Sequence, residues 1–115
     1  MEGTGTCADQ PVMLYEKGNW MTNFDIARCM VLQTLHARID TPGERMRIQR
    51  KVYFLQEFGV KLGFFYAQGV DGPFSGDLAD FLSENKSVIQ YGYFEGRTLK
   101  PNVLDRIRQA NTLYQ

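Results

Sequence analysis

The chain has 115 residues, with 13 basic and 13 acidic side chains and 43% hydrophobic residues. This length suits one domain that buries a real hydrophobic core. The zero net charge argues against a uniformly basic nucleic-acid binder and against a protein held on anionic lipid by bulk charge.

Targeting signals and cysteines narrow the class further. No stretch approaches the roughly 20 apolar residues that cross a bilayer, and the N-terminus lacks the basic start and apolar run of a signal peptide. Two cysteines, Cys7 and Cys29, make neither a disulfide framework nor a four-ligand zinc site. We therefore expect a cytoplasmic protein with reduced thiols, no membrane contact, no metal and no cofactor.

The sequence predicts an N-terminal arm followed by one domain. Residues 1–20 are rich in glycine and short polar residues and predict a flexible N-terminal arm, so that 21–115 form a single helical domain. The first helix starts at Thr22, a good N-cap, with Asp25 placed to complete a capping box. It should end before Pro42, because a residue that precedes proline avoids helical angles.

The middle of the chain alternates helix and extended segments. Apolar spacing predicts a second helix over 44–58, stopped by a glycine, and an aromatic-rich strand within 60–68. Asp71-Gly72-Pro73 predicts a turn, after which Ser75 caps a third helix that ends near Asn85.

The last third predicts a hairpin and a helix. Alternation over 89–93, a turn at Glu95-Gly96 and a return strand over 97–99 predict a β-hairpin, and Pro101 opens the last helix. A helix followed by a hairpin is the outline of a winged helix. The expected fold class is therefore α+β, a mainly helical single domain with a small antiparallel hairpin, winged-helix-like.

Two sets of residues are candidates for catalysis. Cys29 and His36 are two helical turns apart and would share a face without touching, so a core cysteine and a partly exposed histidine are the simpler interpretation. Asp77 and Asp80 belong to an acidic cluster between Asp71 and Glu84 and line one edge of a helix. A solvated helix face is the simpler interpretation of this cluster. We expect that the protein is not an enzyme.

Charge and aromatic residues are unevenly distributed. Between Arg38 and Lys61, six basic residues face three acidic ones, whereas between Gly69 and Gly96 a single lysine opposes five acidic residues. The positive part could bind phosphates or an acidic partner, with an ordinary solvated helix face as the alternative. Eleven of the 15 aromatic residues fall between positions 53 and 94, and most of these should be core.

Two motifs in the central segment carry a family resemblance. Residues 48–56, IQRKVYFLQ, resemble the LQKLVYLLQ helix of prokaryotic YwgA-like proteins and the KLLYFAQ helix of SocA-like, or Panacea, antitoxin domains. Residues 72–82, GPFSGDLADFL, resemble the glycine-proline turn and acidic-leucine helix that complete the pattern. Lys51 and Asp71 depart from it, standing where an apolar and an aromatic residue are usual.

The resemblance spans residues 48–82 and implies a small bacterial or phage-associated helical domain that works by binding. SocA-like members resemble antitoxins and adaptors that neutralise or deliver a partner toxin, and YwgA-like domains occur in toxin–antitoxin proteins linked to ADP-ribosylation of DNA. The pattern supplies a scaffold and a turn, and it carries over no catalytic residue.

Together these features favour a non-enzymatic protein-interaction module, antitoxin-like or associated with a phage or mobile element. Its partner would be a protein such as a toxin, contacted by exposed aromatic and acidic side chains, namely Phe74, Asp77, Asp80, Tyr91 and Tyr93. A symmetric homodimer is compatible with base rates for small proteins.

The alternative is a winged-helix-type nucleic-acid-binding regulator. The hairpin would be its wing, and the second helix would contact phosphates through Arg45, Arg47, Arg50 and Lys51. Binding that weakens with added salt would be its signature.

Overall fold

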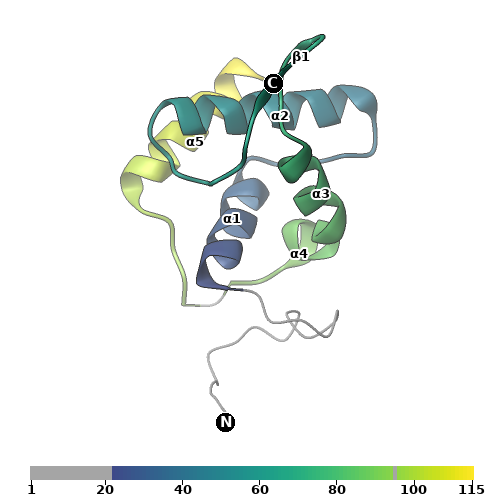
Figure 1. The fold of residues 1–115 in the computed structure, drawn as a ribbon. Coiled ribbons are helices and arrows are strands. Elements are labelled where there is room, and N and C mark those ends of the chain that lie inside the picture. The colour runs from purple at the N-terminus through teal and green to yellow at the C-terminus, as the bar shows by residue number, and fades with distance from the viewer. Residues whose placement is uncertain (1–21, 95) are drawn as a thin grey trace.

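Helices account for most of the described chain, residues 22–94 and 96–115 of a computed structural model (Figure 1). The elements in chain order are α1 (Asn23–Thr34), α2 (Pro42–Glu57), β1 (Ala67–Gly69), β2 (Gly72–Phe74), α3 (Gly76–Glu84), α4 (Lys86–Tyr91) and α5 (Pro101–Leu113). The mainly helical composition with one two-stranded antiparallel sheet confirms the expected α+β class. The predicted arm, 1–20, lies outside the described residues. Among those described, no helix has the length and apolar character to span a bilayer.

Polar caps start the first two helices. The Thr22 side chain accepts a hydrogen bond from the Asp25 backbone N–H at 3.0 Å, which confirms the predicted N-cap. The Asp25 carboxylate accepts from Arg28 at 3.4 Å, and the predicted capping box is not completed. Thr41 and Glu44 form a full capping box at α2, in which each side chain bonds the other residue's backbone N–H at 3.1 Å. Pro42 fits the first turn because that turn needs no N–H from it, so α2 begins two residues earlier than predicted.

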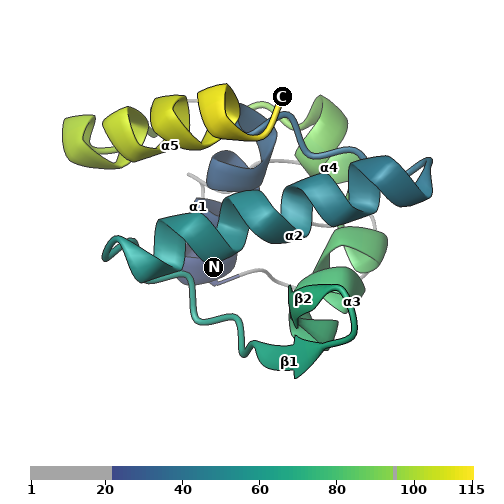
Figure 2. The same cartoon turned by 90° about the horizontal axis from the view of Figure 1, so that it is seen from above.

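The core lies where the helices converge on α2. Figure 2 shows α5 on one side of α2 and the hairpin with α3 on the other, while α1 packs with α4. The largest fully buried side chains come from α1, the loop after it, α2, α3 and α5, and include Ile26, Leu32, Leu35, Val52, Leu55, Leu78 and Ile107. Helices predicted from 3.6-residue spacing are thus confirmed by the burial of their apolar faces.

The hairpin lies at a different place from the one predicted. The residues expected to form its first strand are mostly in helix α4, which ends at Tyr91, and no strand occurs in the described part of 92–99. Neighbouring Val88 and Ile89 are both buried, which a helix permits and an alternating strand does not. Because α4 follows α3, the helix-then-hairpin order behind the winged-helix expectation is not found there.

The strand predicted within 60–68 is wrong for its aromatic residues 64–66, and only Ala67 and Gln68 of that range belong to β1. Residues 60–66 have no regular structure, and a side chain rather than a partner strand satisfies part of their backbone. The Gln56 amide donates to the Phe64 carbonyl and accepts from the Phe64 N–H, both at 2.9 Å. The backbone groups of Phe64 therefore need no partner strand.

The turn also moves, by one or two residues. Val70 and Asp71 form the loop between β1 and β2, while Gly72 and Pro73 belong to β2. Gly72 has a φ of +113°, which an L side chain rarely adopts. Pro73 lies opposite Gln68 in the ladder. The neighbouring pairs are Gly69 with Gly72 and Ala67 with Phe74. Proline lacks an N–H and fits only a position whose N–H would point away from the partner strand.

Candidate functional site: a groove between α2, the hairpin and α3

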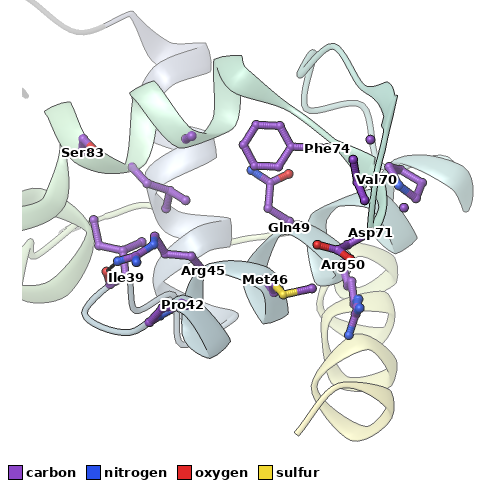
Figure 3. A pocket seen from close by; sticks show the side chains of 15 residues that line it. Ile39, Pro42, Arg45, Met46, Gln49, Arg50, Val70, Asp71, Phe74 and Ser83 are labelled. Carbon is purple, nitrogen blue, oxygen red and sulfur yellow. Dashed lines mark hydrogen bonds between the residues drawn. The ribbon is translucent and has the colours of Figure 1, made fainter.

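A groove of about 470 Å³ opens between the first half of α2, the hairpin and α3 (Figure 3). Most of the side chains that line it are apolar, among them Ile39, Pro42, Met46, Val70, Phe74, Ala79 and Leu82. Its charged lining residues are Arg45, Arg50 and Asp71. These segments are far apart in the sequence, so the groove exists only in the folded chain.

A buried glutamine joins two walls of the groove. The Gln49 amide, on α2, donates to the Ser75 carbonyl and accepts from the Ser75 backbone N–H, each at 2.9 Å. Ser75 has no exposed surface, and its hydroxyl accepts from the Leu78 N–H at 3.1 Å and thereby caps α3. Gln49 therefore fixes the start of α3 against α2.

Gln49 and Gln56 make the same kind of contact from one face of α2. They are seven residues apart, close to two helical turns. Each forms hydrogen bonds with both backbone groups of one residue outside the helix, Ser75 for Gln49 and Phe64 for Gln56. Between them, the Tyr66 hydroxyl donates to the Gln49 carbonyl at 2.8 Å, and burial raises the pKa of this phenol. Neither glutamine is among the site residues predicted from the sequence, although two amides seven residues apart on an apolar helix face were the available signal.

The predicted partner-binding residues of the hairpin and α3 separate in the structure. Phe74 lines the groove and is 52% exposed. Asp77 and Asp80 are exposed on α3 but do not line the groove, and the Asp77 carboxylate accepts from the Phe65 N–H at 3.3 Å. Of these three candidates, the structure brings only Phe74 to the groove.

The two predicted contact tyrosines lie outside the groove as well. Tyr91 is 81% exposed at the end of α4, and Tyr93 is 70% exposed two residues later. Their exposure agrees with the sequence reading, although they extend from a helix end and not from a hairpin.

The basic residues of α2 point in different directions. Arg45 and Arg50 line the groove, whereas the exposed Arg47 borders a separate hollow of about 20 Å³ with His36 and Arg38. The four basic residues of the nucleic-acid hypothesis therefore do not share one face.

Lys51 lies inside the domain, with 6% of its surface exposed. Its ammonium donates to the Leu35 carbonyl and to the Asn111 side-chain oxygen, both at 2.9 Å. Burial lowers the pKa of Lys51, and the Arg47 cation lowers it further. Leu35 is the C-cap of α1, and the helix dipole favours a cation at this end. Lys51 thus anchors α1 and is not placed to contact a phosphate.

Cys29 and His36 do not form a reactive pair. Cys29 is fully buried in α1 with a free thiol, and burial, followed by the Asp25 carboxylate, raises its pKa to about 12. His36 is exposed beyond the helix end, with a φ of +61°. A thiol held neutral in this way is a poor nucleophile. Within the described ranges, no group of three or more His, Cys, Asp or Glu side chains could hold a metal ion.

The buried thiol leads to a prediction about alkaline pH. Because the folded-state pKa is about 12 against an ordinary 9.0, the folded thiol keeps a proton that the unfolded thiol releases. The contribution of Cys29 to stability is therefore complete below pH 9 and should decline above it, by up to about 1.4 kcal/mol per pH unit. Urea unfolding of the wild type and of Cys29→Ala between pH 7 and about 10.5 measures this decline as a shrinking difference between them. Parallel profiles would contradict the prediction.

Comparison of the chain with family models, with curated proteins and with solved structures gave no match. The class of protein is therefore defined by the fold and the site alone. It is a mainly helical α+β domain with an open, largely apolar groove that carries two arginines and one aspartate.

Proposed function

We propose that this protein is a non-enzymatic protein-interaction module of the antitoxin-like kind that its central segment resembles, and that a protein partner binds in the groove. The observation that carries the proposal is the groove itself, about 470 Å³ and mostly apolar in its lining. Contiguous exposed apolar surface around a concavity is typical of contact sites for another molecule.

Exposure of the groove's apolar side chains supports the proposal. Val70 is entirely exposed at the tip of the hairpin, and Met46 is 38% exposed on α2. Phe74, another lining residue, has half of its surface exposed. Covering such side chains with a partner would remove apolar area from water and stabilise the complex by roughly 25 cal/mol per Å² before the entropic cost of association.

A substitution that fills the groove tests this function. Ala79→Arg places a long charged side chain in the lining, and Ala67→Arg makes the same change at an exposed alanine of β1 outside the lining. When each tagged protein is purified from a native host, we expect a partner protein to be retained by the wild type and by Ala67→Arg. Ala79→Arg should reduce the retained partner at least about tenfold, since a buried unpaired charge opposes binding.

Two outcomes of the purification would contradict the proposal. One is a wild-type chain that emerges alone at every concentration. The other is equal retention by Ala79→Arg and Ala67→Arg. Binding to duplex DNA, measured on the same proteins from low to high salt, tests the nucleic-acid alternative, for which a steep loss of affinity with salt is diagnostic. We expect no DNA binding, because Lys51 is buried and Arg47 does not share a face with Arg45 and Arg50, which line the groove.

A further inference from the structure

Charge in the groove is not balanced from end to end. Figure 3 shows Arg50 and Asp71 at the hairpin end and Arg45 toward the start of α2, with Met46 between the two arginines. The opposite charges of Arg50 and Asp71 give the hairpin end no net charge, although these two side chains form no ion pair. At the other end the charged lining residue is Arg45, and no described carboxylate forms an ion pair with it.

Arg45 is held in position by the backbone. Its Nη1 donates to the carbonyl of Ile39 at 2.7 Å, and Ile39 itself lines the groove. One hydrogen bond occupies a single N–H of a guanidinium that carries five. A group fixed in this way loses less conformational entropy when it pairs with a ligand.

Helix geometry adds to the positive character of this end. Pro42, in the first turn of α2, also lines the groove, so the positive end of the helix dipole lies beside Arg45, with the capping Glu44 carboxylate offsetting part of it. The rest of the lining is mostly apolar, with Met46 and Leu82 among its side chains, and its polar side chains include Gln49 and Ser83. A ligand that matches both features needs apolar groups and a carboxylate.

We propose that the occupant of the groove is a short segment of a protein partner that inserts apolar side chains and pairs an Asp or Glu carboxylate with Arg45. This inference rests on the proposed function and adds the chemistry of the partner. A nucleic acid matches the lining less well, because Asp71 repels phosphate and the apolar side chains offer a phosphodiester backbone no partner.

Selection from a random twelve-residue peptide display library on the full chain tests the proposal. We expect selected peptides to share apolar residues at a fixed distance from an Asp or Glu. Selection on Arg45→Glu should instead enrich Lys or Arg at that place, because the charge of the groove's end is reversed. Arg47→Glu, the same change on the same helix outside the groove, should select the wild-type pattern.

Affinity of one selected, labelled peptide gives the quantitative test. Arg45→Glu should weaken it at least tenfold, Arg45→Gln by a smaller factor, and Arg47→Glu by less than twofold, with circular dichroism confirming that all three fold. Arg45 and Arg47 are both exposed, so neither change opens the core.

Each outcome separates the partner chemistry from the function. Peptides without an acidic residue, or equal losses in Arg45→Glu and Arg47→Glu, would overturn the carboxylate pairing and leave a protein-binding groove. Failure to select any peptide, together with a dimer that Ala79→Arg dissociates, would replace the foreign partner by a second copy of this chain. Failure to select any peptide and full partner retention by Ala79→Arg would overturn the proposed function itself.

Discussion

Replacing Gln49 with alanine is expected to lower the free energy of unfolding by about 3 kcal/mol. The substitution removes the amide that satisfies both backbone groups of Ser75, which has no exposed surface. A buried donor or acceptor left without a partner costs about 1–3 kcal/mol, and here one of each is left. Urea unfolding followed by far-ultraviolet circular dichroism measures the change. The same variant should weaken peptide binding, because Gln49 lines the groove and holds α3 beside it.

Gln68→Ala is the matched control for this prediction. Gln68 is an exposed glutamine of β1, so its removal should change the free energy of unfolding by no more than about 0.5 kcal/mol. If Gln49→Ala lowers the free energy of unfolding no more than the control does, water replaces the amide at Ser75. The contact between Gln49 and Ser75 would then not stabilise the fold.

The single substitution Arg28→Ala is also expected to lower the free energy of unfolding by about 3 kcal/mol. The Nε of Arg28 donates to the Leu62 carbonyl at 2.8 Å, and its guanidinium lies over the Phe24 and Phe64 rings at 4.3 and 4.4 Å. These contacts bind the irregular segment 60–66 to α1. A hydrogen bond from a charged donor contributes about 1.5–3 kcal/mol, and each cation–π contact about 0.5–2 kcal/mol.

Two variants separate shape from charge at this position. Arg28→Lys keeps the cation but lacks the planar group that stacks on two rings, so we expect it to recover no more than about half of the loss. Arg38→Ala removes an exposed arginine and should stay within about 0.5 kcal/mol of the wild type. If Arg28→Lys is as stable as the wild type, charge alone accounts for the effect, and the proposed stacking makes no contribution.

The parts of the fold that the sequence predicts are those with local causes. The caps Thr22 and Ser75, and Pro101 in the first turn of α5, act within one helical turn of themselves, and the helices they start are found in the structure. Helix α4 was missed because its alternating apolar and polar residues match a strand over a few positions. Burial of Val88 and Ile89 on one side of a short helix decides the conformation, and that depends on the rest of the fold.

A few residues of the groove were candidates from the sequence, but the groove itself was not predicted. Phe74, Arg45 and Arg50 were candidates from sequence, yet they belonged to two separate hypotheses before the structure put them around one groove. The roles of the α2 glutamines needed knowledge of which distant backbone groups lacked partners. The inward direction of Lys51 likewise depends on where α1 ends, since its ammonium donates to the carbonyl of Leu35, the C-cap of that helix.

The two sides of the groove differ in stiffness, and this bears on how widely it can recognise partners. One side is a helix of 16 residues, whereas the other includes a hairpin with three residues in each strand. Isolated two-stranded hairpins are marginally stable, and this one is tied down mainly at Ser75 and Tyr66. We expect a hairpin this short to yield to side chains of different sizes while the helix stays fixed. Such a groove accepts a range of shapes, and the fixed cation on the helix then does more than the shape of the walls to decide which sequences bind.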